Sequence, residues 1–147
     1  MDEVVKVSDQ ESFWEKSSFV VVTDKTKPAM KLTIDELQRM GKKVYVVDLS
    51  GSPDQGTVHR TQDIPSNLDC AIVGLQKEKT ENAIIELKKK GILRCWIHWR
   101  TETDQAKERC AQLQMQYIAG KCPMMYLSHG LNIHTIHAWL SGLHEKH

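Results

Sequence analysis

The chain has 147 residues, of which 40% are hydrophobic and 27% are charged, and its formal net charge is +1. A chain of this length suits one domain with one core, and its apolar content excludes an intrinsically disordered protein. The near-neutral charge argues against a dedicated nucleic-acid binder, which usually carries a basic stripe. We therefore expect one domain over residues 1–147 with no nucleic-acid partner.

The four cysteines form no CxxC pair, and two of them, Cys70 and Cys95, lie inside apolar runs. Cysteines in such runs usually pack as small core residues. The chain begins without a signal peptide, and no apolar run approaches the roughly 20 residues that a membrane helix needs. Free thiols without a secretion signal predict a cytoplasmic protein with no membrane partner.

The first third of the chain predicts two strands and two helices. Ser8-Asp9-Gln10-Glu11 fits a capping box that opens a short helix through Trp14. The run from Phe19 to Val22 is apolar without alternation, which is typical of a strand buried on both faces. Pro28 to Gly41 predicts a helix, because proline suits a first turn and glycine a helix end. Val44 to Val47 predicts a second buried strand.

The rest of the chain continues this alternation. Thr57 to Arg60 predicts a short strand, and Cys70 to Leu75 a buried one. Thr80 is the expected cap of a helix from Glu81 to Lys90, which Gly91 ends. The remaining predicted elements are a strand from Leu93 to Trp99, a helix from Thr103 or Asp104 through Met115, a short strand from Tyr117 to Ala119, an apolar segment from Met124 to Leu127, and a helix from Asn132 to about Leu143.

This order of elements predicts an α/β fold. Strands that alternate with helices form a mostly parallel sheet with helices on both faces, here a Rossmann-like doubly wound sheet of five or six strands. Ligands of such folds bind outside the carboxyl ends of the strands, where the strand order reverses. The segment VVVTDKTKPAMK, from Val20 to Lys31, runs from the first strand into the next helix and is the first place to look for a site.

Four segments resemble the small CoA-binding-domain family, whose Rossmann-like members are related to the nucleotide-binding domain of the succinyl-CoA synthetase α subunit. They are FVVVTDKTKPAMK, GKKVYVVDLSG, VHRTQDIPSNLDCAIVGL and KCPMMYL. The resemblance extends from about Ser8 to Leu127, and the Asp-Ile-Pro turn followed by Leu-Asp is its most specific mark. It implies a domain that binds CoA or an acyl-CoA.

The chain departs from this family where the ligand's phosphate is expected. The family loop has a glycine as the first strand ends and then a serine, whereas this chain has Val22-Thr23-Asp24. Glycine allows the backbone to approach a phosphate closely, and Asp24 would repel an anion unless it turned away or capped the helix. Lys27-Pro28-Ala29 stands in place of the family's Arg-Pro-Ser, and Asp48-Leu49 in place of its Asn-Pro.

Two interpretations of the first loop stay open. Amides at the start of the helix carry partial positive charge, and Lys25, Lys27 and Lys31 can act as phosphate partners. The alternative is a degenerate loop with solvated lysines. Asp48 lies near the offset at which dinucleotide-binding folds hold a ribose hydroxyl, but no G-x-G-x-x-G motif is present, so a turn aspartate is the favoured interpretation.

Two further features have a functional and a structural interpretation. His98, between Trp96 and Trp99 at a strand end, suits a cleft wall for an adenine or pantetheine group, or else a covered strand end. Histidines are frequent beyond residue 128, but they lack the i,i+4 pair of zinc helices, so we predict no metal site and expect that helix to pack on the sheet or on a second copy. Neither Ser-His-Asp order nor a Walker loop is found, so the sequence does not support an enzyme.

The expected function is therefore binding of CoA or acyl-CoA without chemistry. The alternatives are a domain that has lost its ligand and acts through protein contacts, and an NAD(P)-type binder. The candidate binding residues are Thr23, Asp24, Lys25, Lys27, Pro28, Ala29, Lys31, Asp48, Leu49, Gly74, Leu75, His98 and Lys121.

Overall fold

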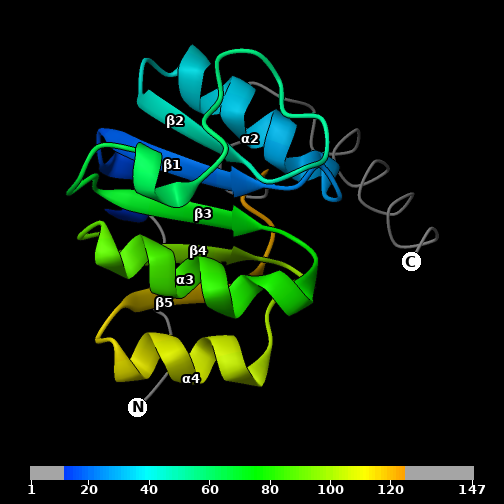
Figure 1. Cartoon of the computed structure of the whole chain (residues 1–147). Coiled ribbons are helices and arrows are strands. Elements are labelled where there is room, and N and C mark those ends of the chain that lie inside the picture. The colour runs from blue at the N-terminus through cyan, green and yellow to red at the C-terminus, as the bar shows by residue number, and fades with distance from the viewer. Residues whose placement is uncertain (1–11, 125–147) are drawn as a thin grey trace.

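The computed structural model describes residues 12–124, which form a five-stranded, all-parallel sheet of order β2-β1-β3-β4-β5 (Figure 1). The sheet is Rossmann-like, as the order of elements predicted. The strands are β1 (Ser18–Thr23), β2 (Lys43–Asp48), β3 (Cys70–Gly74), β4 (Arg94–His98) and β5 (Gln116–Lys121). The helices are α2 (Pro28–Arg39), α3 (Thr80–Lys89) and α4 (Asp104–Gln112), with 3-10 turns η1 (Thr61–Asp63) and η2 (Lys77–Lys79), and residues 12–15 are also helical.

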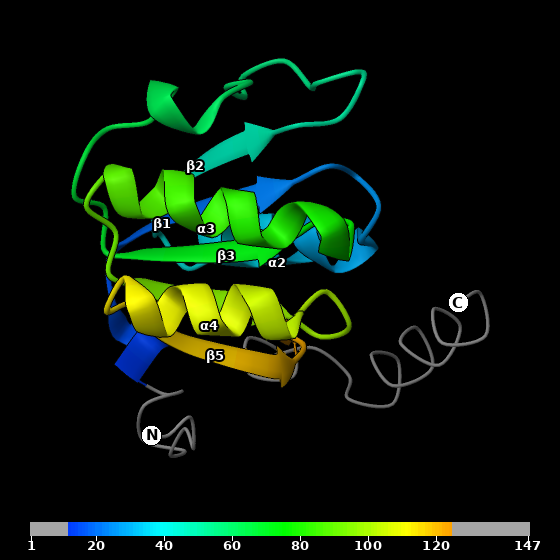
Figure 2. The same cartoon turned by 60° about the horizontal axis from the view of Figure 1, so that its bottom comes forward.

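Both faces of the sheet are covered, which explains the apolar runs without alternation. Val20 and Val22 of β1 pack in the core that α3 and α4 cover, whereas Phe19 and Val21 pack in the core beneath α2. All four side chains are fully buried. Figures 1 and 2 show α3 and α4 side by side on one face and α2 on the other. The prediction of strands buried on two sides is therefore confirmed.

The core beneath α2 contains a cluster of aromatic rings. Phe13, Trp14, Phe19 and Trp96 lie with ring centroids 4.7 to 6.0 Å apart. Offset and edge-to-face ring pairs at such distances stabilise a core beyond the area that they bury. The helical turn at residues 12–15 is thereby anchored on the middle of the sheet.

The connection from β2 to β3 crosses the α3 face without an α-helix. It contains the 3-10 turn η1, and Ile64 and Leu68 bury their side chains in the core there. The strand predicted from Thr57 to Arg60 is reduced to one parallel bridge between Val58 and Val47. The sequence predicts a strand of four residues here, but only Val58 pairs with the edge strand β2.

The helix ends follow the predicted caps in most places. Thr103 caps α4 by accepting a hydrogen bond from the Ala106 amide, and Gly41 adopts a φ of +80° just beyond α2. The predicted cap at Thr80 is wrong, because Thr80 is already helical and its hydroxyl donates to the Thr101 carbonyl at 2.9 Å. The capping box at residues 8–11, the segment after Met124 and the helix predicted from Asn132 lie outside the described residues.

The strand order reverses between β1 and β3. The chain leaves β1 to form β2 on one side of it and then returns to form β3 on the other side. The carboxyl ends of β1 and β3 thus define the switch point, the position at which such sheets usually bind ligands. No helix among residues 12–124 is long and apolar enough to cross a membrane.

Candidate functional site

The candidate site is built where three strand ends are aligned. Thr23, the last residue of β1, is paired with Asp48 of β2 on one side and with Gly74 of β3 on the other. The Leu49 amide donates to the Thr23 carbonyl at 2.8 Å, which joins the β2 loop to the β1 loop. Five of the predicted site residues, Thr23, Asp24, Asp48, Leu49 and Gly74, are therefore neighbours at or beside the switch point.

Asp24 is buried between the loops that follow β1 and β3. Its carboxylate accepts hydrogen bonds from the Gln76 amide at 3.0 Å and the Thr26 amide at 3.1 Å, and a further one from the Thr26 hydroxyl. The Lys79 ammonium lies 3.8 Å away. Burial raises the pKa of Asp24, but the hydrogen bonds from Thr26 and Gln76 and the charge of Lys79 outweigh it and hold that pKa below its ordinary value. The carboxylate is an anion held by the protein's own donors.

Lys25 and Asp48 tie the β1 and β2 loops together. Lys25 has a φ of +67°, and its ammonium lies 2.9 Å from an Asp54 oxygen and 3.7 Å from an Asp48 oxygen. Asp48 also accepts hydrogen bonds from the amides of Ser50 at 2.9 Å and Asp54 at 3.2 Å, and its side chain is 2% exposed. This arrangement is that of a turn aspartate with an internal counter-ion.

The other two lysines of the loop stand at the start of α2. Lys27 is the residue before the first helical turn, with Pro28 at its beginning, and its carbonyl accepts a bond from the Met30 amide. Lys31 pairs with Asp35 at 3.5 Å on the exposed side of the helix. Among residues 12–124, Lys27 makes no ion pair, whereas Lys25 and Lys31 do. Ala29 is fully buried, so its side chain supports the helix from beneath.

Gly74 and Leu75 shape the site from below. A Cβ at Gly74 would lie 2.4 Å from the Sδ of Met30, so the buried Met30 side chain of α2 packs directly on this glycine and would have to shift for any larger residue. Leu75 is fully buried in the core under α3. Gly74 and Leu75 thus hold the end of β3 and its loop in place, while the polar groups of the site belong to other residues.

His98 and Lys121 lie at the same carboxyl edge of the sheet, but two and three strands away from β1 respectively, where β4 and β5 end. They are partners in the strand register, and His98 is 3% exposed. The Lys121 carbonyl accepts hydrogen bonds from the Trp96 indole and the Trp99 amide, each at 3.0 Å. Since β3 separates β4 from β1, the structure does not bring these two residues to the loop that carries the lysines.

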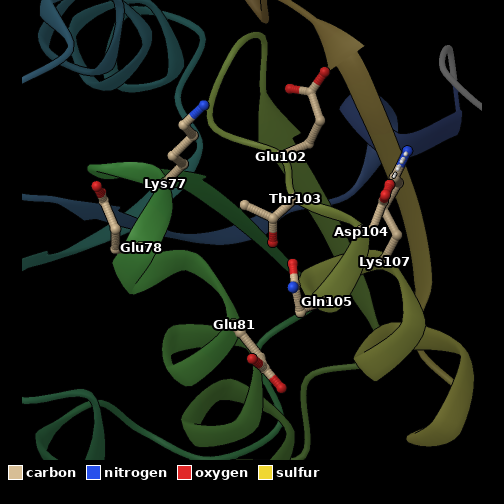
Figure 3. Close-up of a pocket in the computed structure, with 8 residues that line it drawn as sticks. All are labelled: Lys77, Glu78, Glu81, Glu102, Thr103, Asp104, Gln105 and Lys107. Atoms are coloured by element: carbon tan, nitrogen blue, oxygen red, sulfur yellow. Dashed lines mark ion pairs between the residues drawn. The ribbon is translucent and has the colours of Figure 1, made fainter.

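A cleft that the sequence did not predict opens between the starts of α3 and α4 (Figure 3). Its volume is about 620 Å³. The lining residues are Lys77, Glu78, Glu81, Glu102, Thr103, Asp104, Gln105 and Lys107. Glu81 pairs with Arg109 at 2.9 Å and Asp104 with Lys107 at 3.8 Å. Acidic residues at the starts of two consecutive helices were the signal available in the sequence.

The described residues contain no group of three or more His, Cys, Asp or Glu side chains that could hold a metal ion. The histidines beyond residue 128 lie outside the described part. Cys70, Cys95, Cys110 and Cys122 form no disulfide with one another and are buried, and burial raises the pKa of Cys70 and of Cys110 to about 12. Thiols with such pKa values are poor nucleophiles at neutral pH.

Comparison with known proteins gave one family and several solved structures of the same fold. A family model described as "CoA binding domain" matches residues 18–138. No curated protein matches the chain. Among solved structures, a PH1109 protein redesigned for binding, described as Prb, has a TM-score of 0.72 at 18% identity, over 85% of this chain and 92% of that one.

Two further structures have the same fold. A hypothetical protein from Pyrococcus horikoshii OT3 has a TM-score of 0.69 at 17% identity, over 85% of this chain and 95% of that one. The protein described as cell-free ID.343 from Thermus thermophilus has a TM-score of 0.70 at 13% identity, over 82% and 96%. At these identities the likeness shows the fold alone.

Proposed function

The chain belongs to the CoA-binding domain family, and from this premise we propose that it is one domain that binds CoA or an acyl-CoA without catalysis of its own. The binding surface is the start of α2 together with the loop from Thr23 to Lys31. The observation that carries the proposal is the position of Lys27 and Pro28: Pro28 begins α2 and Lys27 directly precedes it, beside the switch point of the sheet. Helix starts attract phosphate through partial positive charge and outward amides.

The contacts of the three lysines assign them different parts in this binding. Lys27 makes no ion pair within the described residues, so its ammonium is available to a phosphate without the loss of a partner. Lys25 holds the β2 loop through Asp54, and Lys31 would have to leave Asp35. We therefore expect weak, salt-sensitive binding that depends mainly on Lys27, because exposed charges are screened by salt.

The test is calorimetric titration of CoA into native protein, Lys27→Ala and Lys43→Ala. Lys43 is exposed at the amino end of β2, away from the loop, so its replacement changes the net charge equally and serves as a control. We expect CoA to bind the native protein and Lys43→Ala alike and Lys27→Ala about tenfold more weakly. Absence of CoA binding by native protein at millimolar ligand would contradict the proposal.

A second candidate is a domain that has lost its ligand and works through protein contacts. The observation in its favour is the internal pairing of Asp24, which accepts hydrogen bonds from the amides of Thr26 and Gln76 beside the switch point. NAD(P) binding is the weaker alternative, because Asp48 is committed to Ser50, Asp54 and Lys25. Tighter binding of NAD than of CoA, lost in Asp48→Ala, would favour it.

The finer expectations about partners and location are also proposals. A nucleotide-type small molecule is the expected ligand, and the free cysteines support a reducing, cytoplasmic environment. Self-association through the helix predicted at residues 132–143 depends on a segment outside the described residues. Light scattering of the full chain and of a chain that ends at residue 124 would test it.

A further inference from the structure

The carboxylate of Asp24 has the surroundings that a bound phosphate would need. Two backbone amides from different loops, Thr26 after β1 and Gln76 after β3, point their hydrogens at it. The ammonium of Lys79 supplies a positive charge 3.8 Å away. The Asp24 side chain is only 2% exposed, whereas Thr26, Gln76 and Lys79 are all exposed. The residues that supply the donors therefore lie at the surface, while their amide hydrogens are bonded to Asp24.

We propose that Asp24 is an internal anion that takes the place of a ligand's phosphate at the switch point and thereby keeps the affinity for phosphate-bearing ligands low. A ligand phosphate is confined to the start of α2 as long as Asp24 holds the amides of Thr26 and Gln76. The proposal rests on the proposed function only for the identity of the native ligand, because the internal anion would act against any phosphate.

Two physical effects act in the same direction. The carboxylate occupies the space and the donors that a phosphate oxygen would use, so these donors must first be released. It also carries a negative charge in the loop that leads from β1 into α2, where it repels a second anion. Removal of the side chain abolishes both effects, while replacement by the isosteric asparagine abolishes the repulsion and leaves the space filled.

The experiment compares Asp24→Ala, Asp24→Asn and native protein by calorimetric titration with inorganic pyrophosphate and with CoA. Asp63→Asn is the matched control, because Asp63 is exposed on η1, pairs with Arg60 and changes the net charge equally. We expect pyrophosphate to bind Asp24→Ala at least about tenfold more tightly than native protein, Asp24→Asn to lie between them, and the control to match the native protein. In Asp24→Ala, pyrophosphate should shift the amide resonances of Thr26 and Gln76.

The possible outcomes separate the internal-anion proposal from the proposed function. A folded Asp24→Ala that binds pyrophosphate no more tightly than native protein overturns the proposal, and where that variant does not fold, an Asp24→Asn with native affinity does so. Pyrophosphate binding by Asp24→Ala without any CoA binding by native protein supports the internal anion and contradicts the proposed function. CoA binding by native protein that Asp24→Ala and Asp24→Asn leave unchanged does the reverse.

Discussion

The ends of β1 and β4 lie on the same edge of the sheet but have different surroundings. Internal bonds join the loops at the end of β1, whereas a cleft opens beyond the end of β4. At β1 the loops are joined by internal bonds: Asp24 to Gln76, Leu49 to Thr23, and Lys25 to Asp54. Beyond β4, the polar residues from Glu102 to Lys107 line an open cleft of about 620 Å³. The topology marks the end of β1 as the site, and the cleft found among residues 12–124 lies beyond the end of β4.

This difference shows what a fold class determines. The strand order places helix starts and loop amides at the switch point in every sheet of this kind. Whether those amides face a ligand depends on single side chains, and here one aspartate occupies them. Substitutions at the β1 end should therefore disturb the fold, while substitutions in the cleft should be tolerated.

The largest effect is expected at Gly74. Its replacement by alanine places a Cβ 2.4 Å from the buried Met30 sulfur, so α2 or Met30 must shift, at a cost of about 3 kcal/mol. Urea unfolding followed by circular dichroism measures this loss. The control is Gly51→Ala, since a Cβ there meets nothing within 4 Å and its backbone needs no positive φ. Equal stabilities of the two variants would show that β3 and α2 are not tightly packed.

The next effect is the stability that Asp24 contributes and its dependence on pH. We expect Asp24→Asn to lose about 2 kcal/mol at pH 7, because the buried acceptor loses its charge. The pKa of Asp24 lies below 3.8 in the folded protein, so the contribution of its charge is fully present above about pH 4 and is lost as the pH falls through the folded pKa.

Melting curves of the two proteins between pH 7 and pH 2.5 test this dependence. Their difference should narrow only below pH 3.8, although both lose stability in acid because Asp48 and Asp69 also have lowered pKa values. A difference that stays constant down to pH 2.5 would mean that the charge of Asp24 contributes nothing.

A smaller effect is expected at the wall of the cleft. Thr103→Ala removes the acceptor of the Ala106 amide and should cost about 1 kcal/mol, whereas Thr103→Ser keeps the cap and should cost a few tenths. The free energy of unfolding of the two variants is the measurement. A loss of similar size in both would assign the role of Thr103 to its methyl group.

The smallest effect is expected inside the cleft. Lys77 makes no ion pair with any residue from 12 to 124, and its side chain is exposed at the rim. Lys77→Ala should change the free energy of unfolding by less than about 0.5 kcal/mol. Thermal unfolding of the variant and of the native protein under the same conditions checks this. A loss of unfolding free energy above about 1 kcal/mol would remove the contrast between the β1 end and the cleft.

The sequence was sufficient for most of the fold because the signals are local. The apolar runs that became β1 and β3, the proline that begins α2 and the threonine that caps α4 each act within a few residues. The predicted cap at Thr80 is wrong because the Thr80 hydroxyl donates to the carbonyl of Thr101, 21 residues away, rather than bonding to its own helix. Such a partner is fixed by the packing of α3 beside the β4 loop.

The candidate site was harder to predict, because its contacts also join residues that are far apart in the sequence. Asp24 was flagged as an obstacle to an anion, but its partner Gln76 follows another strand, 52 residues later. The packing role of Gly74 depends on Met30, and the cleft depends on how closely two helix starts approach each other. None of these distances is encoded by spacing along the chain.

The single bridge at Val58 has a consequence for the behaviour of the protein at high concentration. β2 is an edge strand, and unpaired backbone groups on such a strand can recruit a strand from another molecule. Val58 accepts from the Asp48 amide at 2.8 Å and donates to the Val46 carbonyl at 2.9 Å, so it blocks this edge near its carboxyl end. The long loop after β2 therefore covers part of this edge and reduces the backbone available for edge-to-edge aggregation.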